Sequence, residues 1–199
     1  MTPPIRRVIL IPGLLEPPIA LWPLKRVLQK HCDLVEYFHD RYIFRNVEHS
    51  INRLADMIGE ANQGQSVAIV THSFGDWVAR QAIANVSSHG VVALVSVAPV
   101  MRSGLVPFGL RLISGNMIPE VKIITNRERA AANVDLGDRV RRLVIWARVD
   151  ECVRCIPLDH ITNAQHVPAT HLTVILQPNV LRMVEQFVFS GGCDESRYE

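Results

Sequence analysis

The sequence predicts an α/β fold in which helices cover both faces of a mostly parallel sheet of about six strands. Several short runs are apolar at every position, as expected for strands that are buried on both faces. Helical patterns with apolar residues on one side separate these runs, and this alternation is typical of parallel sheets. The continuous apolar runs lie at residues 8–11, 67–70, 91–95 and 143–147.

The first half of the chain alternates regularly between the two kinds of element. Pro12 ends the first strand, and Pro23 predicts the start of a helix because proline favours the first helical turn. Residues 34–38 predict a shorter strand. Residues 47–63 give the clearest amphipathic helix, with apolar side chains at helical spacing. The strand at 67–70 and a further helix follow it.

The second half is less regular because glycines and prolines interrupt it. Within residues 99–142, the pattern predicts a helix near 110–113 and a short strand at 121–124. After the strand at 143–147, residues 165–168 predict a weak strand. The last amphipathic helix is expected at 178–189.

Length and composition predict one folded domain over residues 1–189 and a frayed tail at 190–199. Hydrophobic residues are 48% of the chain and charged residues 20%, a globular composition. No apolar run is long enough for a transmembrane helix. The first apolar run ends at Pro12 and fits a strand better than a signal peptide, so we expect a cytoplasmic protein.

Charge and cysteine content make several classes of function improbable. The net charge of +2 is too small to indicate nucleic-acid binding, and the basic stretch 139–142 predicts a solvated loop entering a strand. The four cysteines include Cys152 and Cys155 in a CxxC pattern that lacks a second pair. Zinc sites need further ligands at suitable spacing. We therefore expect free thiols, no metal and no cofactor.

The segment after the strand at 67–70 holds the candidate nucleophile. Residues 71–75 read Thr-His-Ser-Phe-Gly, a near-match to G-x-S-x-G with Thr71 in the first glycine position. The pattern lies between a buried strand and a helix, which is the context of a nucleophile elbow. Ser73 is therefore the predicted nucleophile. It needs a base and an acid to activate it.

Two further candidates follow later strands. Asp150 comes three residues after the strand at 143–147, and His171 follows the weak strand at 165–168. Functional side chains collect at the carboxyl ends of parallel strands. We therefore expect Ser73, Asp150 and His171 to converge, and His72 to pack in the elbow or to support the catalytic side chains rather than to act as the base. The rival candidates are Glu151 and Asp159 for the acid, and His160 and His166 for the base.

With these residues, the chain resembles the α/β-hydrolase family from about residue 7 to residue 189, and is most similar to small bacterial lipases and esterases without a lid. The chain order of serine, acid and histidine is the family's own. The matching segments are residues 9–14 (oxyanion strand and turn), 70–80 (elbow), 146–153 (acid turn) and 170–187 (histidine segment and last helix).

The resemblance implies an α/β-hydrolase fold with little or no cap domain, and a serine hydrolase that cleaves a carboxylic ester, including a lipid or thioester. It implies a catalytic triad of Ser73, Asp150 and His171. The backbone N–H groups of Leu14 and Phe74 would form the oxyanion hole. The expected partner is a small acyl-ester or lipid-like substrate. An acyltransferase with the same acyl-enzyme, or a non-catalytic binding protein on this fold, stays open.

Two residues after the elbow depart from the family pattern. Asp76 and Trp77 replace the usual Gly-Leu. We expect them to reshape or charge the floor of the substrate pocket, because they directly follow the predicted nucleophile turn.

Overall fold

In the computed structural model of the chain, the structure describes residues 4–32, 34–40, 46–60, 65–114, 118–157 and 163–190. Within these residues, six strands form one sheet in which every neighbouring pair is parallel, in the order β2-β1-β3-β4-β5-β6. The strands are β1 (Ile5–Ile11), β2 (Leu34–Tyr37), β3 (Ser66–His72), β4 (Val91–Val97), β5 (Arg141–Val149) and β6 (Asn163–Thr170).

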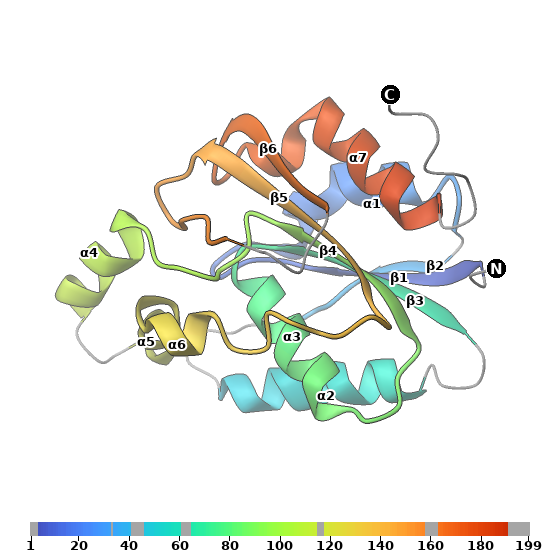
Figure 1. Cartoon of the computed structure of the whole chain (residues 1–199), viewed down its shortest axis with the longest axis horizontal. Helices are drawn as coiled ribbons and strands as arrows, with labels where there is room; N and C mark the ends of the chain where they lie inside the picture. The colour runs from blue at the N-terminus through green and yellow to red at the C-terminus, as the bar shows by residue number, and fades with distance from the viewer. Residues whose placement is uncertain are drawn as a thin grey trace.

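Helices lie on both faces of the sheet, as Figure 1 shows: α1 and α7 cover one face, and α2 and α3 the other. The fold class that the sequence predicts is confirmed. The helices are α1 (Trp22–Leu28), α2 (Val47–Glu60), α3 (Phe74–Asn85), α4 (Leu105–Ser114), α5 (Pro119–Thr125), α6 (Arg127–Ala130) and α7 (Pro178–Phe189), with the 3₁₀ turns η1 (Pro18–Leu21) and η2 (Val174–Leu176).

Burial explains which strands have a strong sequence pattern. All seven residues of β3 are buried, because its neighbours in the sheet flank it and helices cover both of its faces. By contrast, β6 lies at the edge of the sheet and most of its residues are exposed. An exposed edge strand does not need apolar side chains at every position. Its weak pattern at residues 165–168 follows from this position.

The predicted strand at 121–124 is wrong, because these residues lie in helix α5. Pro119 is in the first turn of that helix, and Val121, Ile123 and Ile124 are buried. A short apolar run fits a buried strand and a buried helical turn equally well. The proline four positions after Gly115 was the local signal for a helix start.

Residues 191–199, nearly all of the predicted tail, lie outside the described residues. The last described helix, α7, ends at Phe189 as expected. Among the described helices, none combines the length and apolar character that crossing a bilayer requires. Among the described residues, Cys152 and Cys155 are free thiols, as the sequence predicts.

Candidate active site

Ser73 occupies a sharp turn between β3 and α3. Its backbone has φ 52° and ψ −121°, in the region that residues other than glycine rarely adopt. Such a conformation costs about 1–3 kcal/mol and persists only when the surroundings impose it. Here the Ser73 N–H donates to the Val97 carbonyl at 3.0 Å, and the Ser73 carbonyl accepts from the Val100 N–H at 3.3 Å. The strained turn leaves the serine side chain partly exposed.

Gly75 allows this turn to lie close to β1. A Cβ atom at this position would lie 2.5 Å from the Pro12 carbonyl oxygen and 2.6 Å from that of Ile11. These distances are far below van der Waals contact, and both obstacles are backbone atoms. The second glycine of the elbow motif is thus required by packing.

The structure brings Ser73, Asp150 and His171 together at the carboxyl ends of β3, β5 and β6. The Nε2 atom of His171 lies 2.8 Å from Ser73 Oγ, and its Nδ1 atom lies 2.9 Å from Asp150 Oδ2. A carboxylate only accepts hydrogen bonds, so Nδ1–H donates to Asp150. In the neutral ring, Nε2 is then the acceptor and the serine hydroxyl donates to it.

Backbone donors fix the orientation of Asp150. Its Oδ1 atom accepts hydrogen bonds from the N–H groups of Cys152 at 2.9 Å and Val153 at 2.8 Å. This leaves Oδ2 to face His171. The side chains of Asp150 and His171 are 6% and 5% exposed, so water competes little for their hydrogen bond.

The rival acids and bases do not join this arrangement. Glu151 is exposed, and the carboxylate that faces His171 is that of Asp150. His166 is exposed on β6. Asp159 and His160 lie outside the described residues.

The two predicted oxyanion donors flank Ser73. Phe74 is the first residue of α3, where backbone N–H groups give a helix its partly positive end. Leu14 lies in the turn after β1, and its N–H makes no hydrogen bond with any described residue. A Cβ atom on the preceding Gly13 would lie 3.0 Å from Ser73 Cβ, so this turn lies against the serine.

Glu16 and His72 both lie at this site, although the sequence predicted no role for Glu16 and only packing or support of the catalytic side chains for His72. His72 Nδ1 lies 2.8 Å from Glu16 Oε2, and His72 Nε2–H donates to the backbone carbonyl of His171 at 2.9 Å. Glu16 Oε2 also accepts from the Gly13 N–H at 2.6 Å. The available signal was an acid placed three residues after Gly13, in the turn that faces the elbow.

Asp76 does not face the substrate side as the sequence suggested. It is fully buried and forms ion pairs with Arg80 at 2.8 Å and with Arg142 at 3.2 Å. Its Oδ1 atom also accepts from the Ser96 hydroxyl at 2.6 Å. The expectation of a solvated loop at 139–142 is wrong for Arg142, because this side chain is buried on Asp76.

Arg80 extends this buried network to the loop after β4 and to the end of helix α6. It donates hydrogen bonds to the carbonyls of Val100 at 2.8 Å and Ala130 at 3.0 Å. Trp77, the other unusual residue after the elbow, is buried, stacks on Phe74 and donates to the Arg129 carbonyl. These residues therefore hold the segments after β4 and α5 against α3.

One group of potential metal ligands overlaps the site. Ligand atoms of Asp150, Cys152 and His171 lie within 4.8 Å of one another. The hydrogen bond between Asp150 and His171 already explains their proximity. Burial, reinforced by the charges of Glu151 and Asp150, raises the pKa of the Cys152 thiol to about 11. A protonated thiol is a poor metal ligand.

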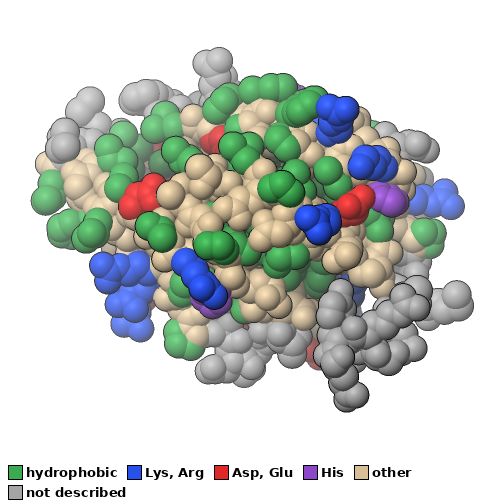
Figure 2. Space-filling model, turned by 90° about the horizontal axis from the view of Figure 1, so that it is seen from above, with side chains coloured by type: hydrophobic (Ala, Val, Ile, Leu, Met, Phe, Trp, Pro, Cys, Tyr) green, Lys and Arg blue, Asp and Glu red, His purple; other side chains and the backbone are tan. Residues whose placement is uncertain are grey.

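Exposed apolar side chains lie in segments that follow the carboxyl ends of the strands. Leu15, Leu172 and Leu176 are 75%, 66% and 54% exposed and follow the ends of β1 and β6. Helix α4 adds Leu105 and Phe108, and hydrophobic side chains extend over the end of the molecule that carries this helix (Figure 2). The edge of the sheet that holds Ser73 thus has an apolar border.

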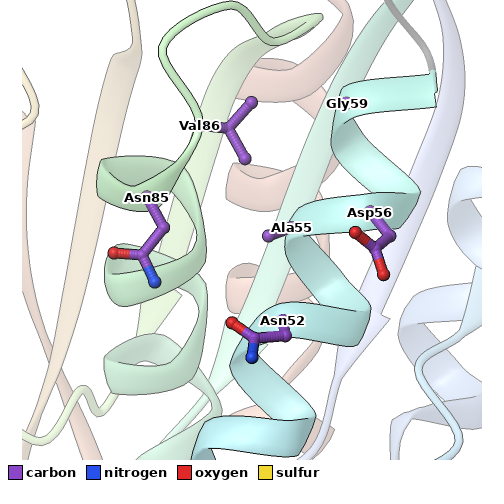
Figure 3. A pocket seen from close by; sticks show the side chains of 6 residues that line it. All are labelled: Asn52, Ala55, Asp56, Gly59, Asn85 and Val86. Atoms are coloured by element: carbon purple, nitrogen blue, oxygen red, sulfur yellow. The ribbon is translucent and has the colours of Figure 1, made fainter.

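A shallow groove between α2 and α3 lies elsewhere (Figure 3). Its lining includes Asn52, Asp56 and Asn85. Asn85 ends α3, whereas Ser73 precedes its first residue. At 1.5 Å per residue, the helix separates them by about 18 Å. The groove is therefore not part of the Ser73 site.

Solved structures similar to this chain establish its fold. The RedJ thioesterase from the prodiginine biosynthetic pathway of Streptomyces coelicolor is 14% identical, with a TM-score of 0.61 over 92% of this chain and 90% of that one. A putative aryl esterase from Burkholderia cenocepacia is 16% identical, with a TM-score of 0.58 over 92% and 89%. A putative hydrolase of the α/β superfamily from Xanthomonas campestris is 15% identical, with a TM-score of 0.58 over 92% and 95%.

The chain therefore has the α/β-hydrolase fold over about nine-tenths of its length. No protein-family model matches the sequence. A sequence search of curated proteins also found no match.

Proposed function

We propose that the protein is a serine hydrolase that cleaves a carboxylic ester, including a thioester, through an acyl-enzyme on Ser73. The observation that supports this function best is the position of His171 between Ser73 and Asp150, at 2.8 Å and 2.9 Å. Nucleophile, base and orienting acid in this order are what acyl transfer requires.

In the proposed reaction, the Ser73 hydroxyl attacks the acyl carbon while His171 Nε2 takes its proton. Asp150 holds the histidine tautomer and stabilises the imidazolium that forms. The N–H groups of Leu14 and Phe74 donate to the oxyanion, and each such donor contributes about 3–4 kcal/mol. His171 then protonates the leaving alcohol or thiol. Water, activated by the same base, releases the acid and restores Ser73.

The apolar border of the site supports an acyl group with substantial hydrophobic surface. Leu15, Leu172 and Leu176 expose side chains close to the carboxyl ends of the strands. Burying one such side chain against an acyl chain is worth about 1.5–3 kcal/mol. Esterases and a thioesterase among the similar structures also support this substrate class.

Labelling with a fluorophosphonate probe tests the proposal. The probe forms a covalent bond with an activated serine, so wild-type protein should be labelled and Ser73→Ala should not. Ser87→Ala, at an exposed serine after α3, is the matched control and should label normally. Folded wild-type protein that takes up no probe, and hydrolyses neither p-nitrophenyl esters nor acyl thioesters, would contradict the proposed function.

A further inference from the structure

A second pair of ionisable side chains lies beside the candidate catalytic residues and takes no part in the proposed reaction. His72 is the last residue of β3, and Glu16 lies in the turn after β1. Their side chains are only 2% and 9% exposed. The ring of His72 is centred 5.1 Å from the ring of His171. Burial of two ionisable groups carries a desolvation cost, which points to a role for this Glu16–His72 pair.

The hydrogen bonds assign the protons of the pair. A carbonyl oxygen has no proton to give, so His72 Nε2–H donates to the His171 carbonyl at 2.9 Å. Glu16 Oε2 accepts from the Gly13 N–H at 2.6 Å and faces His72 Nδ1 at 2.8 Å. An oxygen between two N–H groups is best satisfied as a carboxylate. His72 then donates from both ring nitrogens.

The charge of Glu16 agrees with this assignment. Burial acts to raise the pKa of its carboxyl group, but the hydrogen bond and charge of His72, the hydrogen bond from the Gly13 N–H and the charge of His171 together outweigh burial. The net effect is a pKa below the ordinary value. Glu16 is therefore ionised at neutral pH.

The pair connects two loops that belong to distant strands. Three strands, β3, β4 and β5, separate β1 from β6 in the sheet. Glu16 closes the turn after β1 through the Gly13 N–H, and the Glu16 N–H donates to the Gly13 carbonyl at 3.3 Å. Within that turn, Leu15 has a φ of 63°, which for leucine requires support from its surroundings. His72 attaches the other end of the pair to the backbone of His171.

We propose that Glu16 and His72 are positioning residues. Through His72, which directly precedes Ser73, they join the Leu14 oxyanion turn to the loop of His171. The proposal rests on the function proposed above. The Glu16–His72 pair sets the distance between the oxyanion donor and the base without touching substrate. Its loss lets the two loops move relative to Ser73, and a displacement of about 1 Å between reacting groups lowers turnover on the order of 10²-fold.

Glu16→Gln removes the charge and keeps the shape. An uncharged amide oxygen at the position of Oε2 accepts from Gly13 and His72 more weakly than a carboxylate does, so both hydrogen bonds of the pair are weakened. We expect kcat for p-nitrophenyl butyrate to fall on the order of 10²-fold, with KM changed by less than about threefold. A trifluoromethyl ketone analogue of the tetrahedral intermediate should bind more weakly by the same factor as kcat/KM falls.

Two substitutions of His72 separate the two ends of the pair. The amide nitrogen of glutamine reaches about as far as imidazole Nε2, so His72→Gln keeps the donor to His171 and loses the one to Glu16. His72→Asn does the reverse, because its shorter amide reaches the position of Nδ1. A link between the loops needs both ends. Both variants should therefore lose turnover, whereas a role limited to the His171 backbone would affect His72→Asn alone.

Glu36→Gln is the matched control. Glu36 forms an ion pair with Arg7 on the first two strands of the sheet, away from Ser73. It should change thermal stability but not kcat. Fluorophosphonate titration gives the concentration of competent sites, so kcat is expressed per folded site.

The outcomes distinguish failure of this inference from failure of the proposed function. Active wild type with unchanged kcat per site in Glu16→Gln and in either His72 variant would overturn the positioning role alone. A kcat that falls only in proportion to the unfolded fraction would also overturn it. Wild type that is neither labelled nor active would overturn both proposals.

Discussion

Asp150→Asn tests the orientation of the proposed base, and the structure dictates how the new amide must lie. Two backbone donors, the N–H groups of Cys152 and Val153, point at Oδ1. The amide oxygen must take that position, because an NH₂ group there would oppose both donors. The NH₂ group then faces His171 Nδ1 and donates to it. This reverses the hydrogen bond that wild-type Asp150 accepts at 2.9 Å.

The expected loss in kcat follows from the tautomer of His171 that this reversal imposes. With Nδ1 as acceptor, the neutral ring of His171 carries its proton on Nε2, where it faces Ser73 Oγ at 2.8 Å. That nitrogen can no longer take the serine proton. A wrong tautomer of this kind lowers kcat about 10⁴-fold, equivalent to about 5.4 kcal/mol of transition-state stabilisation. Thermal stability should change little because the shape is preserved.

The assay is steady-state hydrolysis of p-nitrophenyl butyrate, with the melting temperature measured on the same samples. Glu151→Gln is the matched control: it removes the neighbouring exposed acid and should keep near-wild-type kcat. The reasoning is refuted if folded Asp150→Asn stays within about tenfold of wild type, or if Glu151→Gln is the more damaged variant.

Substitutions or chemical modification at four other residues test further parts of the structure. His171→Ala should lower kcat about 10³-fold or more, and His166→Ala far less, in the same ester assay. Asp76→Asn breaks the buried ion pairs with Arg80 and Arg142 and should cost about 3–5 kcal/mol in urea unfolding. The pKa of Glu16 in the folded protein lies below its ordinary 4.5. Ionised Glu16 therefore stabilises the folded state fully above pH 4.5, and this stabilisation is lost as the pH falls through the lower pKa. In Glu16→Gln the free energy of unfolding should fall less steeply with decreasing pH in this acidic range. With a pKa of about 11, Cys152 should react slowly with iodoacetamide at pH 8, and rapidly once the protein is unfolded.

Each of these has a contrary result. Greater loss in His166→Ala would show that the base is misassigned. Unchanged unfolding of Asp76→Asn would mean that its ion pairs contribute nothing net. If the free energy of unfolding of Glu16→Gln falls as steeply with acidic pH as that of wild type, the loss of stability comes from other carboxylates. Rapid alkylation of native Cys152 would contradict its burial.

The local sequence pattern was sufficient to predict an element where burial of apolar side chains dominates. The continuous apolar run in β3, followed directly by the elbow motif, favoured a strand covered on both faces, and all seven residues of β3 are buried. Local pattern failed at residues 121–124, where three apolar residues and one lysine fit a helical turn as well as a strand. It also failed for Arg142, since a charged residue is buried only when a distant partner, here Asp76, meets it.

Periodicity and strand ends are local properties, so they were enough to predict the parallel sheet and to find Ser73, Asp150 and His171 after three of its strands. The tertiary structure decided how these residues meet: the 2.8 Å and 2.9 Å contacts of His171 and the two backbone donors to Asp150. It alone placed Glu16 against His72, 56 positions away. Hydrogen bonds between side chains on different strands depend on sheet order and loop path, and neither leaves a periodic trace in the sequence.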